Sequence, residues 1–450
     1  MVSLYRRGED LVEAPRRTAT APGGTAAAAV APVAPGSGKP ITIQDVVNLR
    51  LVTAEFQPIV RLDTAESVGF EAFARGPAGD LSNPGALFGA AHTAGLSVEL
   101  DQVAHAAAYR AALNAKLNPS QSLFVNADPT TLGRAIPNDL ADVYAQAVAR
   151  LRLFIDVSER HISSDPSAAL AGLARVRAAG WGVSWDNAGT TPDSLALMPL
   201  IRPDVVKLDV SLVQDRSHPF AARVVNAAIA YAENAGAAIM AVGIESEEHL
   251  GMARGMGASL GQGYFFARPA ALPERTKQVV SPILLIDQLE PPQPRATPYS
   301  IFATRNTPTP ASVGTMEAFA HYLEQRCSVD PDPPVVMACL KGGLLPSGAP
   351  VALLEMIARN ASYVAAFADE LPPRLLSGVR MIEIAEDDPL GEEAVLVVVG
   401  PHFAGMLTAR QRRSAGDDTM NLGLSYHRPT VLQAAQTLLH RINAASARAA

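Results

Sequence analysis

Residues 237–250 read AAIMAVGIESEEHL, and this stretch carries the pattern from which the fold is inferred. Six small or apolar residues (237–242) are followed directly by a turn rich in carboxylates that begins at Glu245. A continuous apolar run is typical of a parallel strand that is covered on both faces. In α/β proteins the functional side chains lie where such strands end. The residue at the end of this strand is Val242, which has no acid–base or metal-binding chemistry.

Further apolar strands precede and follow this one, and Ala-rich helical stretches separate them. The predicted strands are SLFVNA (122–127), LRLFIDV (151–157), GWGVSW (180–185), DVVKLD (204–209), AIMAVG (238–243) and GQGYFF (261–266). The helices predicted among them include 98–115, 166–178 and 218–235. Upstream, TAEFQPIVRL (53–62) and ESVGFEAFAR (66–75) form a hairpin. This order predicts a (β/α)8 barrel of the TIM type whose first strand pair is antiparallel. An open doubly wound sheet is disfavoured, because no Gly-rich dinucleotide turn follows the first strand.

The composition of the chain predicts four segments. Residues 1–44 form a tail rich in Ala and Pro that cannot bury enough surface to order itself, and residues 45–275 form the barrel. Residues 276–300 contain LEPPQPRATPYS (289–300), which is typical of a linker. The last segment, 301–450, is predicted to be a second α/β or α+β domain. Its predicted strands are PPVVMACL, VRMIEIA and EAVLVVVG, and its predicted helices are 351–369 and 430–445.

Charge and hydropathy restrict the partners and the compartment. The net charge of −7 argues against a nucleic-acid partner, because no basic excess is present to replace phosphate counterions. No stretch approaches the roughly 20 apolar residues that cross a bilayer. The N-terminus lacks the apolar core of a secretion signal, so we expect a cytoplasmic protein. Cys327 and Cys339 form no disulfide framework, and we expect buried thiols rather than a redox pair.

Polar residues recur where the predicted barrel strands end. They are Glu71, Asn126, Asp156, Asp186, Asn187, Lys207, Glu245 and Gln262. One such residue alone is more often a helix cap than a ligand. Several oxygen donors that converge on one rim are what Mg²⁺ or Mn²⁺ binding requires, and a lysine among them suits a phosphate.

These residues carry a resemblance to a known family. Residues 52–269 resemble an EAL domain, the family of cyclic di-GMP phosphodiesterases. The segments that match it in order and spacing are FQPIVRLDTAESVGFEAFAR, LFVNADPTTL, LFIDVSE, WDNAGTTPDSL, VVKLDVSLV, AVGIESEEHL and LGQGYFFARP. Active members resemble two-metal hydrolases, in which paired cations activate a water and stabilise the charge of the displacement.

The resemblance assigns metal ligation to Glu71, Asn126 and Asp186, together with Asp156. Asp156 stands where the family has a glutamate, so its carboxylate reaches about one methylene less far. The first metal site is therefore expected to be weakened, and Mg²⁺ or Mn²⁺ is not strictly required for ligand binding.

Two further departures affect the second metal. Asn187 replaces an aspartate, and Val242 replaces the glutamate that the family uses near the second metal and the attacking water. Loss of an acid–base group alone lowers a rate about 10²–10⁴-fold. The resemblance implies catalytic roles for Lys207 and Glu245. Either these two residues keep those roles, or their charges now neutralise one another.

Binding need not fail together with catalysis. The resemblance implies that Gln57 bonds a guanine edge, that Arg75 pairs with a phosphate and that Gln262 contacts the ligand near the rim. The alternatives are a strand-end amide for Gln57 and a surface ion pair for Arg75. The whole predicted ligand-binding set is Gln57, Glu71, Arg75, Asn126, Asp186 and Gln262.

The C-terminal segment is similar to a DICT domain, a sensory module found beside cyclic di-GMP domains. The resemblance lies in EEAVLVVVGPHFAGMLTARQ (392–411) and GLSYHRPTVLQAAQTLL (423–439). His427 and Arg428 there either contact an anion or make hydrogen bonds at the start of a helix.

Three functional hypotheses follow. The first is a catalytically degenerate EAL protein that binds cyclic di-GMP or a partner protein and couples it to a C-terminal sensor. The second is a weakly active phosphodiesterase that hydrolyses cyclic di-GMP to linear pGpG. The third is a protein-interaction module without nucleotide binding. A signalling protein and a second copy of the chain are the candidate protein partners.

Overall fold

The computed structural model describes most of the chain from residue 40 onward. The described residues are 40–129, 131–188, 192–215, 220–274, 276–289, 293, 295–329, 332–340, 349–371, 376–412 and 419–449. Most of the predicted tail and part of the predicted linker lie outside them. By its contacts the chain divides into one unit of residues 1–54 and 74–108 and a second unit of residues 55–73 and 109–450.

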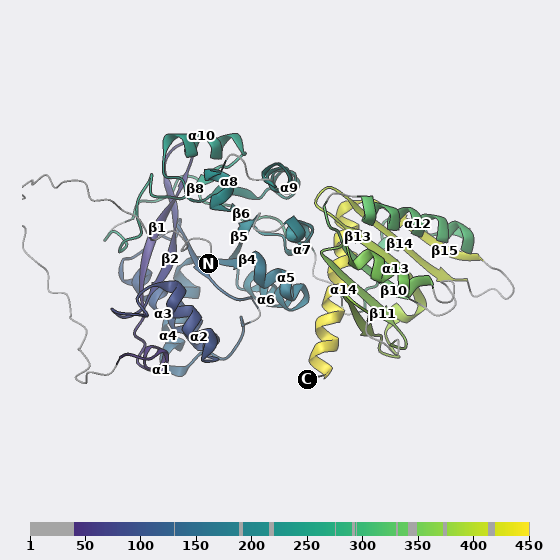
Figure 1. The fold of residues 1–450 in the computed structure, drawn as a ribbon, viewed down its shortest axis with the longest axis horizontal. Coiled ribbons are helices and arrows are strands. Elements are labelled where there is room, and N and C mark those ends of the chain that lie inside the picture. Colours follow the sequence, from purple (N-terminus) through teal and green to yellow (C-terminus); the bar gives the residue numbers. More distant parts are fainter. Residues whose placement is uncertain are drawn as a thin grey trace, which may run out of the picture. The chain divides into compact units, whose positions relative to one another are not determined.

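Eight strands close into a barrel in the order of the sequence (Figure 1). They are β1 (Thr53–Arg61), β2 (Ser67–Arg75), β3 (Ser122–Asn126), β4 (Arg152–Ser158), β5 (Gly182–Ala188), β6 (Val205–Leu208), β7 (Ala238–Ala241) and β8 (Leu260–Gly261). β1 pairs antiparallel with β8, with Val60 opposite Gly261, whereas neighbouring strands from β2 to β8 pair in parallel. The predicted barrel with an antiparallel first pair is confirmed.

Helices alternate with the parallel strands. They are α1 (Ile43–Asn48), α2 (Pro84–Thr93), α3 (Ser97–Asn114), α4 (Asn138–Arg150), α5 (Glu159–Ser164), α6 (Pro166–Ala178), α7 (Met198–Ile201), α8 (Val210–Gln214), α9 (Ala221–Ala235) and α10 (Glu247–Gly255). The helices predicted at 98–115, 166–178 and 218–235 are confirmed as α3, α6 and α9. The strand predicted at 261–266 is wrong beyond its first residue, because β8 ends at Gly261. The chain turns there, and the N–H of Phe266 donates to the carbonyl of Gly263.

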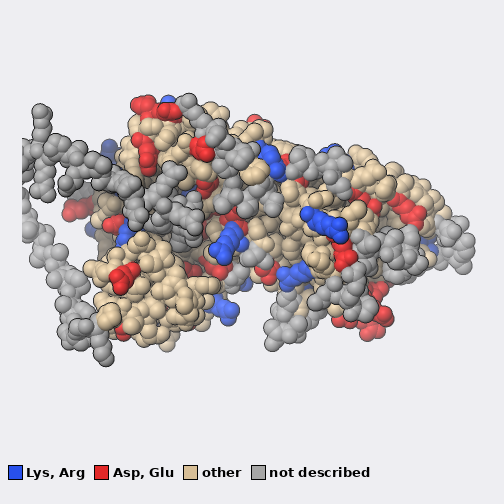
Figure 2. Space-filling model, in the orientation of Figure 1, with Lys and Arg blue, Asp and Glu red and all other residues tan. Residues whose placement is uncertain are grey.

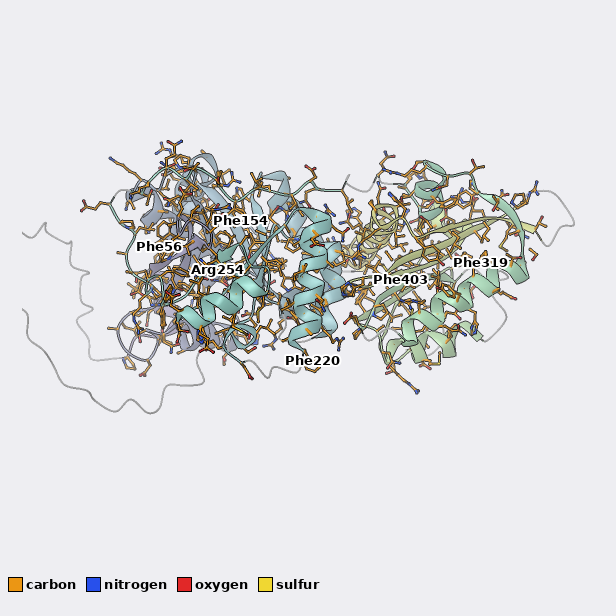
Figure 3. All side chains as sticks on the ribbon, turned by 90° about the horizontal axis from the view of Figure 1, so that it is seen from above. Phe56, Phe154, Phe220, Arg254, Phe319 and Phe403 are labelled. Atoms are coloured by element: carbon orange, nitrogen blue, oxygen red, sulfur yellow. The ribbon has the colours of Figure 1, made fainter. Side chains whose placement is uncertain are left out.

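The barrel interior is filled by large side chains. Phe154, labelled in Figure 3, stacks on Phe124 with ring centroids 4.6 Å apart. A Cβ at position 182 would lie 2.4 Å from the Phe154 ring, so Gly182 leaves the space that this ring occupies.

Residues 276–287, which the sequence assigns to a linker, lie across the N-terminal ends of the barrel strands. The N–H of Val279 donates to Ser120 Oγ before β3, and the N–H of Ile286 donates to Asp204 Oδ1 before β6. Val279 and Ile283 are buried in the apolar cluster of the barrel. The barrel therefore includes this strap, and the sequence missed it because its Pro and polar residues resemble those of a connection.

The C-terminal domain is a seven-stranded mixed sheet with helices on both faces (Figure 1). The strands, in sheet order, are β12 (Val379–Glu383), β11 (Tyr363–Ala368), β10 (Val335–Leu340), β13 (Glu393–Val399), β14 (Ala404–Gln411), β15 (Thr419–Ser425) and β9 (Thr309–Ser312). Helices α12 (Val313–Val329) and α13 (Ala349–Ala358) cover one face, and α11 (Pro298–Ala303) and α14 (Arg428–Ala449) cover the other.

The helix predicted at 351–369 is wrong in its second half. α13 ends at Ala358, and β11 follows and pairs in parallel with both β10 and β12. The alanines of YVAAFA favour a helix in isolation, but pairing on both edges buries this segment as a central strand. The strands predicted at 333–340, 379–385 and 393–400 and the helix at 430–445 are confirmed, with small shifts at their ends. The prediction did not include α12 or β9.

Both cysteines are buried, as predicted, and the thiol of Cys327 donates to the carbonyl of Leu323. None of the helices in the described part of the chain is long and apolar enough to cross a membrane. On the face drawn in Figure 2, acidic and basic side chains of the described residues are interspersed.

Candidate functional site at the barrel rim

A buried lysine lies at the centre of the polar residues on the rim. The ammonium of Lys207, on β6, lies 3.0 Å from Glu71 Oε2, 2.5 Å from Asp156 Oδ2 and 3.0 Å from Asp186 Oδ1. The side chain of Lys207 is 3% exposed. The carboxylates come from β2, β4 and β5, so the parallel register of the barrel brings together residues that lie 136 positions apart in the chain.

Two side-chain amides complete this cluster. Asn126 Nδ2 donates to Glu71 Oε1 at 3.3 Å, and Asn187 Nδ2 donates to Asp186 Oδ2 at 2.6 Å. Asp156 Oδ1 is buried and has no hydrogen-bond partner among the residues that the structure describes. Each other carboxylate oxygen of the cluster is therefore contacted by a nitrogen of the protein itself.

The cluster holds more negative than positive charge. Burial disfavours the ammonium of Lys207, but the carboxylates of Asp156, Asp186 and Glu71 outweigh it and raise the pKa of Lys207 well above its ordinary value. Burial also raises the pKa of Asp156 well above its ordinary value, against the attraction of Lys207. The carboxylates therefore favour the charged form of Lys207, and burial favours the protonated form of Asp156.

A backbone irregularity places Asp186 and Asn187. The pairing of β5 with β6 shifts register between Trp185 and Ala188, and Asn187 has a φ of 60°. A bulge of this kind redirects side chains next to functional sites. Among non-glycine residues Asn and Asp tolerate this left-handed conformation best, so the asparagine fits the backbone as well as an aspartate would.

The residues present do not fit the two-cation centre that the resemblance implies. A cation needs unoccupied oxygen ligands, yet the carboxylate oxygens of Glu71 and Asp186 already accept from Lys207 and the two amides. Among the residues that the structure describes, no group of three or more His, Cys, Asp or Glu side chains is arranged to hold a metal. The side chains predicted as metal ligands converge, but around a lysine.

Val242 and Glu245, from the stretch 237–250, have other roles. Val242 is half-buried and packs against the apolar cluster of the barrel. Glu245 is exposed, and its backbone N–H donates to His249 Nδ1. The carboxylate-rich turn is the start of α10, where Ser246 caps the helix and acidic residues favour its N-terminus. The interpretation that Lys207 and Glu245 neutralise one another is therefore not the arrangement found, since Lys207 pairs with three other carboxylates.

The residues predicted to bind a ligand have different surroundings. Gln57 is buried, and its Nε2 donates to the carbonyl of Ala267 at 2.9 Å. Gln262 is also buried, and within the described part of the chain its Nε2 has no hydrogen-bond partner. Arg75 ends β2, is half-buried and donates to the carbonyl of Ala74. A buried amide without a partner costs free energy unless something bonds it, so Gln262 is the clearest candidate ligand contact.

In the C-terminal domain, the residues singled out from the sequence make internal hydrogen bonds. Arg428 donates to the carbonyls of Gly400 and Pro401, and His427 Nδ1 bonds Thr430 Oγ1 at 2.8 Å. These contacts support the alternative in which this pair forms hydrogen bonds at the start of a helix.

Comparison with known proteins identifies relatives that are similar to part of this chain. Two relatives are the cyclic di-GMP phosphodiesterase RocR of Pseudomonas aeruginosa, 29% identical over 36% of this chain and 41% of its own length, and the probable cyclic di-GMP phosphodiesterase PdeB of Escherichia coli, 27% identical over 52% of this chain and 45% of its own length. The chain thus spans less than half of either relative. A solved structure of Klebsiella pneumoniae BlrP1 with manganese and cyclic di-GMP is 26% identical, with a TM-score of 0.43 over 49% of this chain and 56% of its own. The EAL domain model matches residues 42–269, which is half of the chain, and the protein therefore belongs to the EAL domain family.

Proposed function

We propose that this protein is a signalling protein whose EAL barrel binds cyclic di-GMP without hydrolysing it and couples the bound state to the C-terminal domain. The names of the relatives support cyclic di-GMP as the ligand, since RocR is named a cyclic di-GMP phosphodiesterase and PdeB a probable one. The similarity of residues 392–411 and 423–439 to a DICT domain supports the sensory role of the C-terminal part.

The proposed loss of catalysis rests on one observation. Lys207 and the amides of Asn126 and Asn187 donate to the carboxylate oxygens that cations would otherwise bind. The cluster is therefore satisfied largely by the protein itself. Val242 adds to this, because a valine that packs on the core can neither hold a metal nor take a proton from water.

The proposed binding of cyclic di-GMP rests on hydrogen-bond donors outside the Lys207 cluster. With three carboxylates against one ammonium, the cluster does not attract a phosphate by its charge. The phosphates therefore require other partners, and Arg75 supplies a planar guanidinium that can bond a phosphate through two N–H groups. Gln262 supplies a buried donor that lacks an acceptor among the described residues.

The second candidate function is a slow phosphodiesterase that uses a single cation. The observation that favours it is Asp156 Oδ1, a buried carboxylate oxygen with no partner in the cluster. When bound, such a cation would polarise a phosphoryl oxygen and lower the pKa of a water. The residues that would hold it are Glu71, Asn126, Asp156 and Asp186.

Titration of the purified full chain with cyclic di-GMP, with Mg²⁺ and with EDTA, separates these functions, and chromatography of the same samples detects linear pGpG. We expect binding under both conditions and no linear product. Turnover on the order of 1 s⁻¹, within the ordinary range of enzymes, would establish the phosphodiesterase instead. Absence of binding under both conditions would move the barrel to the class of protein-interaction modules.

A further inference from the structure

The C-terminal sheet contains a hollow that the barrel function does not use. It measures about 320 Å³ and is lined by residues of α12 and α13, the two helices that cover one face of the sheet. Its floor is formed by β10, β13 and β14, and its apolar wall includes Met316, Leu340, Leu354, Ile357, Leu396 and Leu407.

Small side chains create this hollow. Ala320 projects from α12, and Ala338 and Ala394 lie on the neighbouring strands β10 and β13; all three line it. Protein interiors are normally packed as densely as organic crystals, with few voids larger than a water molecule. A volume of about 320 Å³ lies at the lower end of the range for pockets that bury small ligands. Pockets that bind small molecules are lined mostly by apolar side chains, with a few polar groups that orient the ligand.

The charged groups on the wall of the hollow are acidic. Glu317 and Glu324, both on α12, line the hollow, and no Lys or Arg is among the described residues that do so. The side chain of Glu324 is 17% exposed, and its contact with an exposed histidine, His321 Nδ1, is 3.5 Å long. Burial raises the pKa of Glu324, so its charge lacks full compensation.

We propose that this hollow binds a small apolar molecule that carries a protonated amine, with the apolar body among the leucines and alanines and the ammonium at Glu324. An ammonium would compensate the partly buried carboxylate, and a charge-assisted hydrogen bond of this kind is about twice as strong as a neutral one. Among the described residues of the wall, a carboxylate or phosphate ligand would face two acids and no Lys or Arg. The proposal does not rest on the binding of cyclic di-GMP by the barrel.

The test uses the full chain and three matched compounds, phenethylamine, phenethyl alcohol and phenylacetate, which share a phenyl ring and differ in charge. Calorimetric titration and the midpoint of thermal unfolding are the two measurements. We expect phenethylamine to bind most tightly and to raise the unfolding midpoint, because a ligand that binds only the folded state stabilises it. Phenethyl alcohol should bind more weakly, and phenylacetate should not bind.

Two kinds of variant locate the site. Glu324→Gln should weaken phenethylamine about tenfold or more and leave phenethyl alcohol unchanged, whereas Glu247→Gln, on the barrel helix α10, should change neither. Ala338→Leu should abolish binding of both compounds without lowering the unfolding midpoint, because the added methyl groups enter existing space. Ala320→Leu, at a half-buried position, provides the same test from the helix side.

Three outcomes would overturn the proposal. They are equal binding of all three compounds, no binding of any of them, and binding that persists in both leucine variants. A lowered unfolding midpoint in both leucine variants would show that the side chains are overpacked and that the hollow is absent. None of these results bears on cyclic di-GMP binding, which the barrel variants test.

Discussion

The side-chain amide of Asn187 donates a hydrogen bond of 2.6 Å to the carboxylate of the adjacent Asp186. An aspartate at position 187 would place a second negative charge against Asp186 instead of a donor. Two adjacent carboxylates at a partly buried site require a cation or a proton between them. The asparagine therefore removes the need for a metal on this side of the cluster while keeping the left-handed backbone of the bulge.

Asn187→Asp should make the barrel dependent on a divalent cation. In EDTA we expect the free energy of unfolding to fall by about 1–3 kcal/mol, because a hydrogen bond is lost and a repulsion is gained. Saturating Mg²⁺ should restore most of it. Denaturant unfolding with and without Mg²⁺ measures both effects, and Asn306→Asp, at an exposed turn, is the matched control. Equal free energies of unfolding of Asn187→Asp and the control in EDTA would show that the barrel does not need the Asn187 amide for stability in the absence of a cation.

Lys207→Met should be far more destabilising. The ammonium compensates three carboxylates in the barrel, and removal of one partner from a buried ion pair typically costs about 3–5 kcal/mol. The double variant with Asp156→Asn should recover part of this loss, because one uncompensated charge is then gone. Urea unfolding of the two variants measures the difference. A loss under 1 kcal/mol would mean that solvent, not Lys207, screens the carboxylates.

The raised pKa of Asp156 predicts a dependence of stability on pH. Between the ordinary aspartate pKa of 3.8 and the raised value in the folded state, the folded chain binds a proton that the unfolded chain has released. Stability should therefore fall as pH rises through this window, with a slope of at most about 1.4 kcal/mol per pH unit from this one group. Lys207 adds no slope there, because its pKa lies far above the window. The free energy of unfolding of Asp156→Asn, measured over the same pH range, gives the contribution of all other groups. Identical slopes for the wild type and Asp156→Asn would contradict a raised pKa of Asp156.

The sequence predicts the barrel well because parallel strands buried on both faces must be continuous apolar runs. The runs at 151–157 and 204–209 became β4 and β6, which carry Asp156 and Lys207 to one rim. The failures have a different cause. The segment YVAAFA became a strand only because β10 and β12 pair with it, and no local pattern encodes that pairing.

The sequence identified the residues of the site more reliably than it identified which of their side chains contact one another. One of the two predicted alternatives paired Lys207 with Glu245 at the strand ends. The side chain of Lys207 instead reaches across the barrel to β2, β4 and β5, and such a reach depends on register rather than on sequence spacing. The start of α10 was the missed signal, since Ser246 followed by Glu247 and Glu248 is a typical helix N-terminus.

Limited proteolysis tests the revised end of the barrel. Lys277 and Arg295 are both exposed trypsin sites in the chain segment between β8 of the barrel and the C-terminal sheet. Trypsin should cut after Arg295 well before it cuts after Lys277, because neighbours of Lys277 are hydrogen-bonded to the barrel and cleavage requires local unfolding. Mass spectrometry of early fragments identifies the site. First cleavage after Lys277 would show that the strap 276–287 does not stay bound to the barrel.

The last prediction concerns the source of affinity for cyclic di-GMP. Arg75→Ala should weaken binding roughly ten- to hundredfold, which corresponds to the loss of a charge-assisted hydrogen bond of about 1.5–3 kcal/mol. Val242→Ala should leave the dissociation constant unchanged and lower only the unfolding midpoint, because Val242 packs against the apolar cluster of the barrel. EDTA should change neither result, since Lys207 and the amides already contact the carboxylates. Titrations of the wild type and both variants, each with Mg²⁺ and with EDTA, provide the comparison. Strict dependence on Mg²⁺ would favour the one-cation phosphodiesterase, and equal affinity of Arg75→Ala and the wild type would place the phosphates on other residues.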